Sequence, residues 1–409
     1  MTKANTPLAA PMLALLLLVG ACSGTSPPKP DESQVRLFTG KGYLTDDQYS
    51  ITTHPLSWKV GDQFMDLLLS LPNRPGKYPL VLYVPGLGEN REAGEAWRTA
   101  WARAGYGVIA LQPLDKDGRA WSSPQALAGD FSHLARERYA GPAMGQRLER
   151  LALLLAELKH RQQQGDPLLA SLDTDQVALA GYDLGAYTAM AAAGEKLKAM
   201  TEPAHPLPIR AVIALSPVAT FSGLAFTARY PNIRVPVLSI TGDQDGDALG
   251  LVDTPSLRQA PFQYMPKGDK YLLLLQDMPH RLYSGGPLGR GMEAQERNAA
   301  SRDTGSTGMG EGPEGGADAG MGPGPGGGME EGRSGGMGRH RGQAAGGGRG
   351  ASNQEGNQSL TRQALAVAAI QGVSTAFLDT YLKQDDTARE WLARDSNRWL
   401  KQQGHLDRK

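Results

Sequence analysis

The chain has 409 residues, enough for one large domain or two ordinary ones, and its 42 basic and 42 acidic side chains leave no net charge. A chain with a pI near 7 lacks the basic excess of nucleic-acid-binding proteins, so we expect no nucleic-acid partner. Cys22 is the single cysteine, which excludes an intramolecular disulfide.

The N-terminus has the pattern of a bacterial lipoprotein signal peptide. Lys3 supplies a positive charge, residues 8–19 form an apolar run too short to span a bilayer, and Val-Gly-Ala-Cys ends at Cys22. Cleavage would remove residues 1–21 and leave a lipidated Cys22 on a polar, Pro-rich tether, residues 22–34. We expect a lipid-anchored envelope protein, on the outer membrane if there are two membranes, because serine and not aspartate follows the cysteine. An ordinary signal peptide with a chance cysteine is the alternative.

Residues 35–284 alternate between strand and helix patterns. Two antiparallel edge strands are predicted at 49–58 and 64–71. Continuous apolar runs, typical of buried parallel strands, follow at 78–84, 106–111, 177–180, 209–215, 235–241 and 271–276. Helices are predicted between them, including 145–164 with its stripe of leucines. This alternation predicts an α/β fold, with a mostly parallel sheet and helices on both faces, and a site beyond the carboxyl ends of the strands.

Residues 285–358 break this pattern. They hold half of the 52 glycines, with almost no β-branched or aromatic side chain, so they bury too little apolar surface to offset the entropy of ordering. We predict a disordered insertion; a metal site built from its methionines and His340 is a weaker alternative. Order returns at 359–409, where helices at 360–382 and 386–400 are predicted to complete the same domain.

The most informative motif is Gly-Tyr-Asp-Leu-Gly at 181–185. An apolar strand pattern enters it and a helix of small residues leaves it, which is the setting of a nucleophile elbow. The glycines are required because strand and helix approach closely at such a turn. The residue at the tip is Asp183, where a serine hydrolase has serine.

Two later residues complete a candidate triad. Of the seven histidines, His280 alone directly follows a strong buried strand and precedes the closing helices. Asp245 lies in the acidic loop after strand 235–241, with Asp243 as the second choice. Asp183, Asp245 and His280 then stand in the order nucleophile, acid, base expected of an α/β hydrolase.

An oxyanion hole would use the backbone N–H groups of Leu87 and Leu184. Leu87 lies in the Gly-rich turn after strand 78–84, and Leu184 directly follows the predicted nucleophile. The chain has no dinucleotide fingerprint, no P-loop and no clustered metal ligands, so we expect neither a cofactor nor a metal.

Five stretches resemble the dienelactone-hydrolase and platelet-activating-factor-acetylhydrolase branch of the α/β hydrolases: 78–92, 181–194, 235–246, 270–285 and 376–393. Together they extend over about residues 45–400, apart from the Gly-rich insertion. The resemblance implies the α/β-hydrolase fold and hydrolysis of an ester or a related small or lipidic substrate. This chain departs from the family at Asp183, where the family has serine, and at Pro85, where it usually has histidine.

Three hypotheses follow from the aspartate. In the first, the chain is a hydrolase: an aspartate needs no base to remove a proton, so His280 is available to activate water. In the second, Asp183 and His280 form an ion pair in an inactive pseudo-hydrolase that acts as a binding or scaffold lipoprotein. In the third, Asp183 attacks the carbon of an epoxide or alkyl halide; residues 218–234 are too short for the cap such enzymes carry, although residues 115–144 could form a partial lid.

Overall fold

The computed structural model describes residues 28–45, 48–204, 207–247, 252, 254–288 and 348–409. The expected signal peptide and Cys22 lie outside the described residues, as do positions 289–347 of the Gly-rich segment, including His340.

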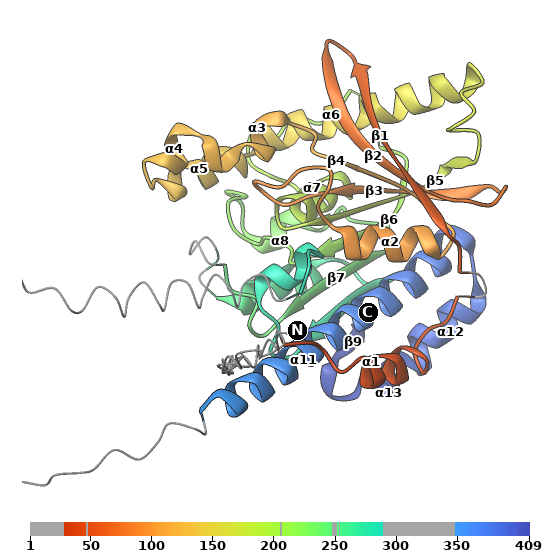
Figure 1. Cartoon of the computed structure of the whole chain (residues 1–409). Helices are drawn as coiled ribbons and strands as arrows, with labels where there is room; N and C mark the ends of the chain where they lie inside the picture. Colours follow the sequence, from red (N-terminus) through yellow and green to blue (C-terminus); the bar gives the residue numbers. More distant parts are fainter. Residues whose placement is uncertain (1–27, 46–47, 205–206, 248–251, 253, 289–347) are drawn as a thin grey trace, which may run out of the picture.

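Nine strands within this described part of the chain form one sheet, in the order β1-β2-β4-β3-β5-β6-β7-β8-β9 (Figure 1). The strands are β1 (Ile51–Val60), β2 (Gln63–Pro72), β3 (Tyr78–Val84), β4 (Gly107–Leu111), β5 (Leu172–Tyr182), β6 (Ile209–Leu215), β7 (Val237–Gly242), β8 (Lys270–Leu275) and β9 (Gly404–Arg408). Strands β3 to β8 are parallel, while β1, β2 and β9 pair antiparallel at the two edges. The predicted α/β class, with a mostly parallel sheet, is confirmed.

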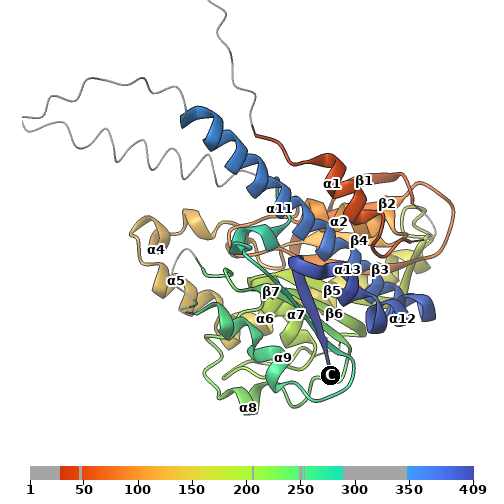
Figure 2. The same ribbon diagram turned by 90° about the horizontal axis from the view of Figure 1, so that it is seen from below.

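Helices cover both faces of the sheet, as Figure 2 shows. On one face lie α2 (Glu95–Arg103) and α11 (Gly348–Leu378), and on the other lie α6 (Gly141–Gln163) and α7 (Leu184–Ala192). Every residue of β3 is buried, and its side chains alternate between the two cores. A strand buried on both faces must be apolar throughout, which explains the continuous apolar runs of the sequence.

The remaining segments are short. The helices are α1 (Glu32–Thr39), α3 (Asp115–Gly118), α4 (Pro124–Leu127), α5 (Phe131–Arg138), α8 (Phe226–Arg229), α9 (Ala260–Tyr264), α12 (Asp386–Arg394) and α13 (Ser396–Leu400). The 3₁₀ turns η1 (Ala120–Ser122), η2 (Pro255–Gln259), η3 (His280–Ser284) and η5 (Lys401–Gln403) and the π-helical turn η4 (Asp379–Lys383) connect them. The predicted lid region, residues 115–144, is helical and carries no strand.

The structure differs from the sequence-based boundaries at three places. Helix α11 begins at Gly348, inside the segment predicted to be disordered, and α1 begins inside the predicted tether, where the Asp31 carboxylate caps its N-terminus. The Asp31 N–H donates to Thr361 Oγ1 at 2.8 Å, so this end of the tether is attached to α11. Strand β9 was missed because its five residues contain one apolar side chain, Leu406, and only pairing with β8 makes it a strand.

One described helical stretch, Gln354–Lys383, is long and apolar enough to cross a membrane. Core helices of soluble proteins pass the same test, and 78% of its most apolar window is buried within the protein. Val373 and Phe377 of this stretch are completely buried in the core beside α2. The stretch is therefore weak evidence for a membrane span.

Candidate functional site

The loops after β3, β5, β6, β7 and β8 surround a cavity of about 260 Å³. Three predicted site residues line it: Asp183, His280 and Leu87. Asp245 lies beneath the cavity and is completely buried. The cavity lies beyond the carboxyl ends of the strands, the position expected for a site in an open α/β sheet.

The predicted strand–turn–helix is present, with Asp183 between β5 and α7. Its backbone angles, φ 50° and ψ −108°, are strained for a residue with a side chain. The surrounding glycines have no room for a Cβ: at Gly185 it would lie 1.8 Å from the Val84 carbonyl oxygen, and at Gly181 it would lie 2.3 Å from the Gly185 carbonyl carbon. Strand and helix are therefore pressed together, and Asp183 is held at the tip of the turn.

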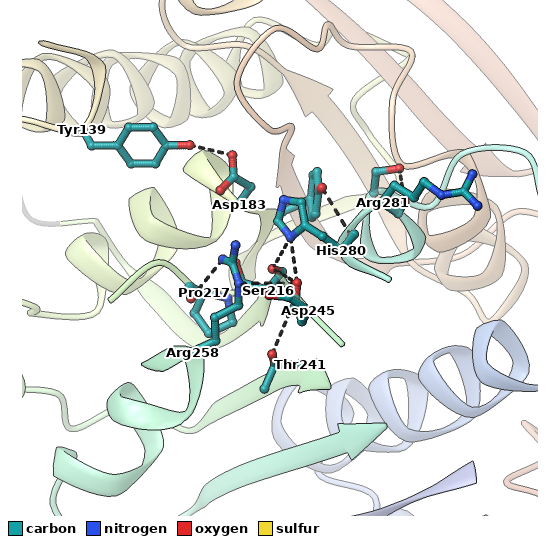
Figure 3. Close-up of polar contacts among 11 residues, drawn as sticks. Tyr139, Asp183, Ser216, Pro217, Thr241, Asp245, Arg258, His280 and Arg281 are labelled. Atoms are coloured by element: carbon teal, nitrogen blue, oxygen red, sulfur yellow. Dashed lines mark hydrogen bonds and ion pairs between the residues drawn. The ribbon is translucent and has the colours of Figure 1, made fainter. Parts of the chain in front are cut away.

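The Asp183 carboxylate is bound by a tyrosine of the lid region. Tyr139, at the C-terminal end of α5, donates its hydroxyl to Asp183 Oδ2 at 2.6 Å (Figure 3). Burial and the neighbouring Asp183 charge raise the pKa of Tyr139 well above its ordinary value, so the phenol remains a donor. No hydrogen bond or ion pair between described groups joins Asp183 to His280, so the ion pair expected in the second hypothesis is not formed.

Asp245, and not Asp243, is the partner of His280. His280 Nδ1 lies 2.7 Å from Asp245 Oδ1, and Thr241 donates to Asp245 Oδ2 at 2.6 Å (Figure 3). Asp243 is exposed, and its carboxylate accepts from the backbone N–H of Asp277 at 2.8 Å. Asp243 therefore stabilises the loop that carries His280 and does not contact the imidazole.

Ser216 is a residue of this site that the sequence analysis missed. It is completely buried just after β6, with a positive φ of 53°. Its hydroxyl donates to Asp245 Oδ1 at 2.8 Å, and its oxygen lies 2.9 Å from His280 Nδ1. The sequence shows only a Ser-Pro pair after a strand, which is no signal for this role.

These contacts determine the histidine tautomer. Because the Ser216 hydroxyl proton goes to Asp245, His280 Nδ1 faces two acceptors and must itself carry a proton. In a neutral imidazole the lone pair is then on Nε2, the position of a general base. Ser216 cannot be a replacement nucleophile, because it is buried and contacts Nδ1 instead of Nε2.

Arg258 joins the loops beneath the imidazole. This buried residue of η2 donates from Nε to the Asp245 carbonyl oxygen at 2.9 Å and from Nη1 to the Ser216 carbonyl oxygen at 3.1 Å. Its Nε also lies 3.4 Å from Asp245 Oδ1. A buried carboxylate requires such compensation, since removal of the partner would leave an unpaired charge in the interior.

Glu89 is a second residue that the sequence analysis missed. It lines the cavity beside Asp183 and His280, and its Oε2 accepts from the Gly86 N–H at 2.9 Å. Burial, with a smaller contribution from the Asp183 charge, raises the pKa of Glu89 to about 7, although the hydrogen bond from Gly86 and the charge of His280 both act to lower it. The available signal was its place in the Gly-rich turn after β3, the turn that also contains Leu87.

The structure places the two predicted oxyanion-hole residues differently with respect to the cavity. Leu184 is the first residue of α7, where backbone N–H groups have no partner within the helix, and Leu87 lines the cavity. Within the part of the chain that the structure describes, neither backbone N–H donates to a protein acceptor. Leu87 thus lies at the cavity with its N–H unused, whereas Leu184 is completely buried and is not among the residues that line the cavity.

In the same described part of the chain, no cluster of three or more His, Cys, Asp or Glu side chains is arranged to hold a metal ion. Neither a scan against protein-family models nor a search of the curated proteins finds a match for this chain. Its function is therefore inferred from the geometry of the cavity.

Proposed function

We propose that this chain is a hydrolase of the α/β-hydrolase family, related to the dienelactone-hydrolase branch, acting on an ester or a related small or lipidic substrate. The observation that carries the proposal is the orientation of His280. Asp245 and Ser216 contact its Nδ1, so Nε2 is the nitrogen that can act as a base. The strand order and the strained elbow at Asp183 support the family assignment.

Asp183 acts as the nucleophile in the proposed reaction. Its carboxylate attacks the acyl carbon of the ester, the bond to the leaving oxygen breaks, and the acyl group becomes joined to Asp183 as a mixed anhydride. The N–H groups of Leu87 and Leu184 stabilise the oxyanion that forms during the attack. His280 Nε2 then takes a proton from water, and the resulting hydroxide releases the acid and restores the Asp183 carboxylate.

The size of the cavity limits the substrate. At about 260 Å³ the cavity is just below the usual range for small-molecule sites, about 300–1,000 Å³. A short acyl group, or the end of a longer lipidic chain, fits this space. We propose no nucleic-acid partner. We propose that lipidated Cys22 anchors the protein to a membrane of the cell envelope.

A second candidate function is favoured by Tyr139. Its phenol lies against Asp183 and comes from the lid region, so it could donate to an oxygen leaving from the carbon that Asp183 attacks. This arrangement suits the opening of an epoxide by aspartate. The resulting alkyl ester of Asp183 would then be hydrolysed by the water that His280 activates.

The decisive experiment compares wild type, Asp183→Ser, His280→Ala and His160→Ala on short acyl esters and simple epoxides. His160 is an exposed control on α6. We expect turnover that is lost in His280→Ala and kept in His160→Ala. An inactive wild type with an active Asp183→Ser variant would instead indicate a binding or scaffold protein.

Single turnover in heavy-oxygen water separates the two candidate reactions. An alkyl ester of Asp183 is hydrolysed by attack at the aspartate carbon, so the heavy oxygen appears in the peptide that contains Asp183. For an acyl substrate we expect the label mainly in the released acid, because the less hindered acyl carbon of the anhydride is attacked.

A further inference from the structure

The proposed reaction lacks one proton donor. In a serine hydrolase, histidine takes the proton of the serine and delivers it to the leaving group. The Asp183 carboxylate has no such proton, and the Nδ1 proton of His280 is held by Asp245 and Ser216. A leaving alkoxide must therefore obtain its proton from another group of the cavity.

Glu89 is placed to be that group. It lines the same cavity as Asp183 and His280, on the loop after β3. The loop is fixed by Gln112, whose side-chain amide donates to the carbonyl oxygens of Gly86 and Glu89, each at 3.1 Å. Glu89 Oε2 accepts from the Gly86 N–H, and Oε1 has no protein partner among the residues described. The acidic proton therefore belongs on Oε1.

We propose that Glu89 is a further catalytic residue of this cavity, a general acid that protonates the oxygen leaving from the substrate. This inference rests on the proposed hydrolase function. The Oε1–H bond breaks as the bond between substrate carbon and leaving oxygen breaks, and the alcohol departs neutral. Glu89 is protonated again by the proton that His280 takes from water, so the net reaction consumes one water.

The surroundings of Glu89 keep its proton in place. Four ionisable groups interact with Glu89 from neighbouring elements. They are Asp183 and Tyr182 at the end of β5, Tyr83 on β3 and His280 on η3. Glu92, Glu95 and Arg281 line an adjoining cavity that Glu89 also borders. Burial and Asp183 outweigh the Gly86 bond and His280, and the resulting pKa of about 7 leaves much of Glu89 protonated at neutral pH.

The test compares wild type, Glu89→Gln and the control Glu92→Gln on two esters of one short acid. The ethyl ester has a poor leaving group that needs a proton, and the p-nitrophenyl ester has a good one that does not. We expect Glu89→Gln to lower kcat/KM for the ethyl ester about 10²–10⁴-fold and to change it little for the p-nitrophenyl ester. The alkaline decline of the ethyl-ester profile near pH 7 should disappear in this variant. Equal losses on both esters would indicate a structural role and overturn the inference.

Two further readouts separate failure of this inference from failure of the proposed function. A wild type inactive on both esters contradicts the function, whereas an active wild type with an unchanged Glu89→Gln variant contradicts only the acid role. Thermal unfolding tests the protonation without turnover. Because the pKa of Glu89 is raised from 4.5 to about 7 on folding, wild type should lose stability relative to Glu89→Gln as pH rises through this interval. A constant difference would show that Glu89 is ionised and would overturn the inference.

Discussion

At the residue scale, the site is defined by one imidazole and the groups that hold it. His280 is 17% exposed, while its partner Asp245 is completely buried. Ser216 and Thr241 both donate to the Asp245 carboxylate, so the buried charge is well supplied with hydrogen bonds. These contacts fix the orientation of the His280 ring. The contribution of each contacting residue can be tested by its own substitution.

Asp245→Asn should abolish most turnover. An asparagine amide that presents its N–H₂ group to Nδ1 stabilises the tautomer with the proton on Nε2, which removes the base. We expect kcat to fall about 10⁴-fold, the loss seen when a catalytic histidine is held in the wrong tautomer. Asp243→Asn is the matched control and should change kcat by no more than about twofold, because the asparagine Oδ1 at this exposed position can still accept the Asp277 N–H that holds the loop. Equal losses in both variants would contradict the assignment of Asp245.

Ser216→Ala should weaken the orientation of His280 without unfolding the protein. The change removes one acceptor from Nδ1 and one donor from Asp245, a loss of about 1–1.5 kcal/mol, which corresponds to about a tenfold decrease in kcat. Nitrogen NMR of His280 should show less of the tautomer with the proton on Nδ1. Ser239→Ala on β7 is the control, since that buried hydroxyl has no hydrogen-bond partner within the described structure. An unaltered His280 spectrum in Ser216→Ala would refute the role.

At the scale of elements, the elbow between β5 and α7 determines where Asp183 lies in the cavity. The strand pattern, the two glycines and the helix of small residues were readable from the sequence because they are local features. These local features bring two distant segments into contact, because α7 packs directly on the end of β3 at Val84. The position of Asp183 therefore depends on three elements at once.

Gly185→Ala should be severely destabilising. Its Cβ would lie 1.8 Å from the Val84 carbonyl oxygen, so β3 and α7 would have to separate. We expect a loss of more than about 4 kcal/mol in the free energy of unfolding, or failure to fold. Gly165→Ala is the control: its φ of +81° is strained, but no atom lies within 4 Å, so the loss should be about 1–2 kcal/mol. Urea unfolding of both variants measures the difference, and similar midpoints would contradict the predicted clash.

At the scale of the whole molecule, the N-terminal segment joins the C-terminal helices. Helix α1 lies beside α11 (Figure 1), and Trp399 donates to the Phe38 carbonyl oxygen at 2.8 Å. Between Cys22 and the cap residue Asp31 the chain can span at most about 30 Å. A lipid on Cys22 would therefore hold the α1–α11 side of the protein near the bilayer.

Cys22→Ser should release the protein from the membrane. The apolar helix at Gln354–Lys383 is mostly buried in the core, so it offers the bilayer little apolar surface once the lipid is lost. We expect radioactive palmitate to label wild type and not the variant, and we expect the variant in the soluble envelope fraction. Ser23→Ala should remain labelled. Persistent membrane attachment of Cys22→Ser would rule out the lipid as the anchor.

The sequence by itself determined the fold class, most strands and the position of the elbow, because these depend on local periodicity and on glycine spacing. Only the tertiary structure decided between Asp245 and Asp243 and revealed the contacts of Ser216 with His280 and of Tyr139 with Asp183. Those pairs are 64 and 44 residues apart in the chain, and no local pattern encodes them. Glu89 likewise became a candidate acid only when the cavity placed it beside Asp183. Periodicity reports which face of an element is buried, whereas the protonation and partners of a side chain depend on what other segments bring to it.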